Sequence, residues 1–158
     1  RIGKLRTAVS FLERALAIEE HVRTGDAAQT HLNLCAALSQ LKKHADALYH
    51  AQCALTRMYE ILSPLMLTGR LQLPGSDGAV AGGGGQGAES PHEKVTVLCI
   101  AYHNLAVEHE YLKNLDAALC AYAEGVKWAS GFLGSKDQVT IILRDSAMAV
   151  KAKLPANS

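Results

Sequence analysis

The sequence predicts an all-α protein of antiparallel helical hairpins that stack on one another. Two small residues recur seven positions apart on a helical pattern, with an alanine or a larger side chain between them. The copies are Ala8/Leu12/Ala15, Ala47/Ala51/Ala54 and Ala118/Tyr122/Gly125. Two of them follow a matching upstream helix, at residues 31–38 and 102–109. Small residues let helix backbones approach closely, and one hairpin cannot bury its apolar faces alone, so neighbouring hairpins must stack.

Composition and charge narrow the class of protein. A chain of 158 residues that is 49% hydrophobic and 20% charged is ordinary for one globular domain. The net charge of +1 gives no electrostatic reason to expect nucleic acid or a membrane surface as partner. The 4 cysteines lack disulfide-framework or zinc spacing, which favours a reducing compartment. No apolar run approaches the roughly 18 to 20 residues that span a bilayer, so we expect no membrane insertion.

The N-terminal part should form three helices. Gly25 can end the first helix in a left-handed conformation, and Asp26 can cap the second, with Gln29 completing a weak capping box. Lys43-His44 is a link short enough to make the second and third helices antiparallel. The chain begins at residue 1 without methionine and enters helix almost at once, so we expect a segment of a longer protein. The expected helices cover residues 5–21, 27–42 and 45–62.

The middle of the chain is irregular. Ser63-Pro64 can start a short separate helix, because proline is tolerated in a first helical turn. Residues 74–90 are rich in glycine, with little to bury and a large backbone entropy to lose. We expect this stretch to be a mobile insertion.

Helical order should resume at residues 90–93. They place a serine at the N-cap, a proline at the first helical position and a glutamate at the capping-box position. Gly131 and Gly134 should break the pattern, Ser135 should cap a final helix, and Pro155 should end it. The expected helices cover residues 91–113, 116–130 and 136–153.

These hairpins resemble tetratricopeptide repeats. Ala8 and Ala47 lie 39 apart in the sequence, near the basic unit of roughly 34. Ala47 and Ala118 lie 71 apart because the irregular stretch separates them. The passage from Ala15 to Ala36 looks most like the longer repeats of kinesin light chains. On this resemblance the chain is a single domain, 1–158, with a half repeat at 5–22, repeats at 27–62 and 91–130, an insertion at 63–90, and a capping or half-repeat helix at 136–154.

The resemblance implies a right-handed superhelix whose concave wall is formed by the first helix of each pair. A peptide or helix of a partner protein would lie in that groove. Asn33 and Asn104 directly precede a packed leucine, and a carboxamide offers one acceptor and two donors for the backbone of an extended ligand. Matched by position, the wall consists of Gln29, Asn33, Ala36, Gln40, Ile100, His103, Asn104, Val107, Tyr111, Arg144, Asp145 and Met148.

Structural explanations stay open beside this one. Each asparagine could be a solvated surface residue or support a neighbouring helix. His31 and His109 occupy positions that normally pack inside the hairpin, so we expect them buried or half-buried. The pairs Cys99/His103 and His31/Cys35 have a spacing that could bind metal, but packing explains them and no supporting acid is evident, so we expect no metal.

The sequence gives no support for enzymatic activity or a cofactor. It has no nucleophile elbow, no His-Glu-x-x-His and no paired acids in a context that would shift their ionisation. The glycine run at 82–85 lacks the Gly-Lys-Ser/Thr of a phosphate loop. We expect Trp128 to be packed between helices rather than to serve as a ligand platform.

We therefore expect a protein–protein interaction scaffold or adaptor in the cytoplasm, with the cytoskeleton as one possible place of association. The alternative is structural: self-association as a homo-oligomer, or assembly into a larger cytoskeletal or motor-linked complex, with the groove filled by the chain's own segments. Recognition of acidic chaperone tails is disfavoured, because Arg144 is the single cation assigned to the inner wall. The candidate self-docking strip is Leu65, Met66, Leu71 and Leu73.

Overall fold

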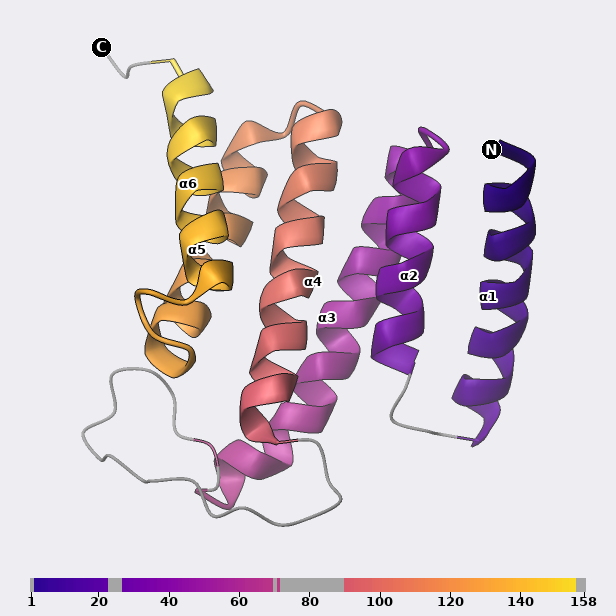
Figure 1. Ribbon diagram of the computed structural model, residues 1–158, viewed down its shortest axis with the longest axis horizontal. Helices are drawn as coiled ribbons and strands as arrows, with labels where there is room; N and C mark the ends of the chain where they lie inside the picture. Colours follow the sequence, from indigo (N-terminus) through magenta and orange to yellow (C-terminus); the bar gives the residue numbers. More distant parts are fainter. Residues whose placement is uncertain (1, 23–26, 70, 72–89, 156–158) are drawn as a thin grey trace.

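The computed structural model describes residues 2–22, 27–69, 71 and 90–155. Within these residues it contains six α-helices and no strand, which confirms the all-α prediction (Figure 1). The expected helix end at Gly25, the cap at Asp26, Leu73 and the glycine-rich stretch up to residue 89 lie outside the described residues. The helices are α1 (Ile2–Val22), α2 (Ala27–Gln40), α3 (His44–Leu67), α4 (Pro91–Tyr111), α5 (Leu115–Phe132) and α6 (Gln138–Lys153).

Pro64 lies inside α3, so the expectation of a separate short helix after residue 62 is wrong. The helix continues because its last turns bury apolar side chains. Leu62 is fully buried, and Leu65 and Met66 pack against the same core. The N–H of Leu71 donates to the Leu65 carbonyl at 2.9 Å, and its side chain is buried as well. Packing therefore outweighs the helical hydrogen bond that proline removes.

The start of α4 confirms the predicted capping box. The Glu93 N–H donates to Ser90 Oγ at 3.2 Å, and the Ser90 N–H donates to Glu93 Oε2 at 2.7 Å. Pro91 occupies the first helical position, where its missing N–H would have had no helical partner.

The turn between α5 and α6 differs from expectation at two residues. Gly131 remains within α5, and the left-handed residue that follows this helix is Gly134, with φ of 96°. Asp137 rather than Ser135 caps α6, because its carboxylate accepts the Val139 N–H at 2.8 Å. A carboxylate also suits the positive end of the helix dipole.

The turns that follow α2 and α4 each contain a residue in the left-handed conformation. Lys42, after α2, has φ of 64°, and Lys113, after α4, has φ of 65°. The next residue in each turn, Lys43 or Asn114, donates its N–H to a carbonyl of the preceding helix, at 3.0 and 2.8 Å respectively. Lys42 and Lys113 are as far apart in the sequence as Ala47 and Ala118, so the repeat interval read from the sequence recurs in the backbone.

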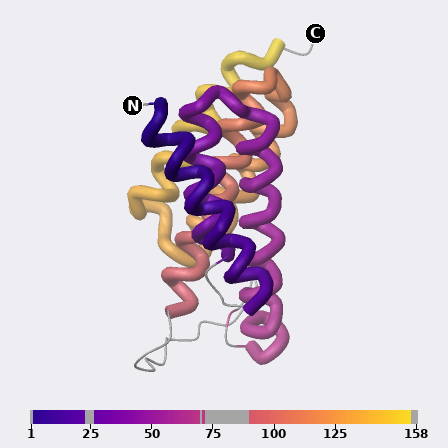
Figure 2. The backbone as a smooth tube through the Cα atoms, turned by 90° about the vertical axis from the view of Figure 1, so that its right-hand side faces the viewer, coloured from indigo at the N-terminus to yellow at the C-terminus, as the bar shows by residue number. Residues whose placement is uncertain are grey.

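The helices form two layers. Each contacts the next along the chain, and α2 also contacts α4, as α4 contacts α6. Among the described helices, the backbone of α1 does not approach that of α3 closely, nor does that of α3 approach α5. Side chains meet there instead: Arg57 of α3 lies 3.5 Å from Glu20 of α1, and Tyr59 of α3 lies edge-on to Trp128 of α5. Figure 1 accordingly shows α2, α4 and α6 side by side in front, with α3 and α5 behind them. Figure 2 views the same stack from the side on which α1 is outermost.

Small residues bring the layers together. Ala47, Ala51 and Ala54 of α3 are all fully buried, as is Ala118 of α5. A Cβ at Gly125 would lie 3.0 Å from Leu143 Cδ2 of α6 and 3.2 Å from Tyr102 Cβ of α4. The α5 backbone therefore sits against both neighbours at a distance that a side chain would not allow.

We expect Gly125→Val to lower the free energy of unfolding by roughly 1–3 kcal/mol, because the added methyl groups must displace Tyr102 and Leu143. Urea denaturation measures this change. Gly3→Val is the matched control: no atom beyond its own turn of helix lies within 4 Å of its Cβ position, and stability should change by at most about 0.5 kcal/mol. Equal effects at the two glycines would contradict the close approach.

Candidate functional site

The residues predicted to line the groove lie on α2, α4 and α6. The central helix, α4, contacts the other two. The repeat interval that takes Ala47 to Ala118 also matches α2 to α4. A second interval matches α4 to α6, because it pairs buried Cys99 and Tyr102 with buried Thr140 and Leu143. Applied to Gln29 and Ile100, these two intervals add Ile141 to the predicted residues. We call the set the α2–α4–α6 face: Gln29, Asn33, Ala36, Gln40, Ile100, His103, Asn104, Val107, Tyr111, Ile141, Arg144, Asp145 and Met148.

Equivalent positions on the three helices form rows. One row is polar: Asn33, Asn104 and Asp145. A second is made of apolar side chains of increasing size, and its members are Ala36, Val107 and Met148. A third consists of Gln29, Ile100 and Ile141. A chain crossing the helices would meet a polar row between two rows that contain apolar side chains.

Exposure differs between the central helix and the flanking ones. All residues of the set on α2 and α6 are exposed. On α4, His103, Asn104 and Val107 are half-buried, whereas Ile100 and Tyr111 are exposed. The middle of the face is therefore partly shielded by its neighbours and still reachable from solvent.

The two asparagines differ in their local hydrogen bonding. Gln29 Nε2 donates to Asn33 Oδ1 at 3.3 Å, so the Asn33 amide nitrogen is free to donate elsewhere. The side chain of Asn104 makes no hydrogen bond to any described residue. A half-buried carboxamide in this condition can satisfy a ligand's backbone at little competing cost.

Tyr111 is tied to the end of the face rather than to its middle. Its ring stacks on His44 of α3 with centroids 4.1 Å apart and an interplanar angle of 13°. His44 Nδ1 in turn lies 2.8 Å from Oε2 of Glu108, a carboxylate that is 2% exposed. Lys42 Nζ is 5.9 Å from the Tyr111 ring centroid. The ring is preorganised by these contacts and remains 52% exposed.

His103 is held from the other side. Its ring meets Tyr122 of α5 edge-on, with centroids 5.8 Å apart. The Tyr122 hydroxyl donates to Glu110 Oε1 at 2.9 Å, and Lys153 Nζ donates to Glu110 Oε2 at 2.7 Å. Glu110 thus joins α4, α5 and α6 next to the face, which fixes the backbone that carries His103 and Asn104.

The expectation that His31 is buried is confirmed, and its ring belongs to a polar cluster. His31 is 3% exposed, and its Nδ1 lies 2.9 Å from His50 Nδ1. Its Nε2 is 3.9 Å from Glu20 Oε1, which Arg57 also approaches at 3.5 Å. Burial first, and His50 second, lower the pKa of His31 from 6.5 to about 4. His109 is half-buried as expected, and burial lowers its pKa as well.

The cysteines and Trp128 behave as structural residues. Burial raises the pKa of both Cys35 and Cys99 to about 12, so neither is a thiolate near neutral pH. Trp128 is buried, with its ring edge-on to Tyr59 of α3 and stacked on Phe132, which confirms the packed interpretation. In the part of the chain that the structure describes, no three His, Cys, Asp or Glu side chains are grouped to hold a metal.

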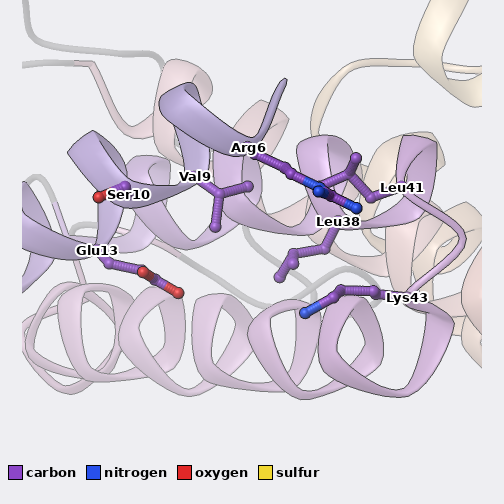
Figure 3. Close-up of a pocket in the computed structure, with 7 residues that line it drawn as sticks. All are labelled: Arg6, Val9, Ser10, Glu13, Leu38, Leu41 and Lys43. Carbon is purple, nitrogen blue, oxygen red and sulfur yellow. The ribbon is translucent and has the colours of Figure 1, made fainter. Parts of the chain in front are cut away.

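A separate hollow of about 420 Å³ lies between α1 and the turn that joins α2 to α3 (Figure 3). Leu38 and Val9 point into it, with Arg6, Glu13 and Lys43 around the rim. Sequence reasoning missed this hollow, because it depends on the angle between α1 and α2. It shares no residue with the α2–α4–α6 face.

In comparisons with known proteins, no family model, no curated protein and no solved structure matches the chain. The assignment of the face therefore rests on the internal repetition and the contacts described above.

We expect acid to destabilise the protein through His31. Its pKa is about 4 when folded and near 6.5 when unfolded, so stability present above pH 6.5 is lost as the pH falls toward 4. The loss should be about 2 kcal/mol at pH 5 and about 3 kcal/mol at full protonation. Urea denaturation of the wild type and of His31→Leu across pH 7.5 to 4 measures it. His21→Gln, at an exposed histidine, should keep the wild-type slope, and a similar slope in His31→Leu would refute the assignment.

Proposed function

We propose that this chain is a non-catalytic adaptor or scaffold of the tetratricopeptide type, which binds a peptide or helix of a partner protein on the α2–α4–α6 face. The observation that carries the proposal is the set of equivalent rows on three helices, of which the central one, α4, contacts both α2 and α6. One row supplies amide and carboxylate groups for a ligand backbone, and the rows beside it supply apolar contact.

The pattern of helix contacts supports a concave shape for this face. Among the first helices, α4 has backbone contacts with both α2 and α6, whereas the backbones of the described second helices α1, α3 and α5 do not approach one another closely. A stack that is closer together on one side than on the other curves toward the closer side. That side carries the predicted residues, as a superhelix with an inner binding wall requires.

One observation argues against the alternative function, in which the chain fills the groove with its own segments. The strip expected to fill the groove includes Leu65, Met66 and Leu71, and all three pack into the main core. They are therefore not available to cover the α2–α4–α6 face. No described helix has the length and apolar character needed to cross a membrane. A cytoplasmic and cytoskeleton-linked location remains part of the proposal.

The proposal predicts that Asn33→Ala and Asn104→Ala each weaken binding of peptides selected against the protein from a random display library. Each variant loses a hydrogen bond between the asparagine side chain and the peptide backbone, which should cost about 0.5–1.5 kcal/mol of binding free energy, or roughly 2- to 13-fold in Kd. Isothermal titration calorimetry measures the change. Gln52→Ala removes an exposed carboxamide from α3, on another helix, and should leave the Kd unchanged. Unchanged affinity in both asparagine variants would refute the face as the binding site.

A further inference from the structure

The outer side of α1 exposes large apolar side chains. Phe11 is 62% exposed, Ile18 65% and Val22 62%. With Ala15 they follow one another at intervals of four, three and four residues, so they lie along one side of the helix. We call Phe11, Ala15, Ile18 and Val22 the α1 outer stripe. A continuous apolar stripe of this kind commonly marks an interaction site.

Internal repetition indicates what kind of element fits there. Ala15 closes the first copy of the small-residue pattern, as Ala54 of α3 and Gly125 of α5 close the other two, and both of these residues are buried. Each lies between the preceding helix and the following one. Ala54 packs with Leu32 of α2 and Ala101 of α4. The Gly125 Cβ position is 3.2 Å from Tyr102 Cβ of α4 and 3.0 Å from Leu143 Cδ2 of α6.

By contrast, among the described helices the backbone of α1 is close to that of α2 alone, and α1 meets α3 through side chains on its inner side. Its inner residues Leu12 and Leu16 pack in the core that α1 shares with α2 and α3. The stripe lies next to those residues on the helix surface and faces away from α2. The side of α1 that corresponds to the helix-covered sides of α3 and α5 is therefore open.

Charge around the stripe favours one chemistry for the occupant. Lys4, Arg14 and His21 are exposed beside it, and none interacts with a described residue. The acids Glu19 and Glu20 are already engaged, with Thr30 at 3.0 Å and with Arg57 at 3.5 Å. Antiparallel pairing of two copies about Ala15 would set Arg14 against the same residue of the other copy, a repulsive arrangement.

We propose that the α1 outer stripe is a second docking surface, which takes an amphipathic helix with acidic residues along one flank from another protein. The helix lies on α1 as α2 lies on α3. Its apolar residues cover Phe11, Ile18 and Val22, and its acids reach Lys4 and Arg14. This surface is distinct from the α2–α4–α6 face, so a single chain can join two partners.

The test uses two fluorescein-labelled 21-residue peptides of high helix propensity, both with leucine at heptad positions a and d. One carries glutamates along a flank, and the other carries lysines there. Fluorescence anisotropy with the full-length protein should show the glutamate peptide binding at least 10-fold more tightly. Ile18→Lys should weaken it at least 10-fold, and Arg14→Glu should reverse the preference between the peptides. Leu67→Lys, at a residue of α3 that is 87% exposed, is the matched control and should have no effect.

Other outcomes would overturn the proposal. Equal affinity for the two peptides, or binding insensitive to Ile18→Lys, would exclude the stripe as an acidic-helix site. A dimer in sedimentation velocity that Ile18→Lys dissociates would assign the stripe to a second copy. Slow alkylation of a Phe11→Cys variant without peptide would show that the full-length protein covers the stripe itself. Asn104→Ala should leave this binding unchanged, which separates its failure from that of the proposed function.

Discussion

Gly125 lies where the backbone of α5 passes between Tyr102 of α4 and Leu143 of α6, and the rest of the stack depends on approaches of this kind. Fully buried alanines have the same role along α3. Dispersion energy falls steeply with distance, so helices that meet at small residues gain many contacts per turn. Their spacing then sets the register of the exposed rows. The α2–α4–α6 face is thus a consequence of how closely the hidden sides of the helices fit.

Polar groups at the junctions make that register specific. Glu108 is 2% exposed, and its Oε2 lies 2.8 Å from Nδ1 of His44, which ties α4 to the first residue of α3. The equivalent position of α2, by the interval that takes Ala118 back to Ala47, is Ala37. A buried carboxylate is costly without its partner, so a shifted packing of α4 on α3 would leave Glu108 unsatisfied. The second full hairpin thereby differs from the first in what locks it to its neighbour.

The sequence was sufficient for the features that local chemistry decides. Periodicity located the six helices, and the Ser90 capping box fixed the start of α4. Prediction from the sequence failed where residues distant in the chain decide the structure. Helix α3 continues through Pro64 because Leu65 and Met66 pack into the core. The rows of the candidate site followed from repeat intervals, which also could have identified Ile141. The stacking of Tyr111 on His44 could not be foreseen, because it joins helices through a turn whose geometry no spacing encodes.

The uneven contacts between helices also have a mechanical consequence. Helix α4 has backbone contacts with both α2 and α6, whereas the backbones of α1, α3 and α5 do not approach one another closely. On that second side the neighbours meet through long side chains, Glu20 with Arg57 and Tyr59 with Trp128. Side chains change rotamer more easily than packed backbones separate, so we expect a ligand that alters the curvature of the stack to be accommodated first on the α1–α3–α5 side.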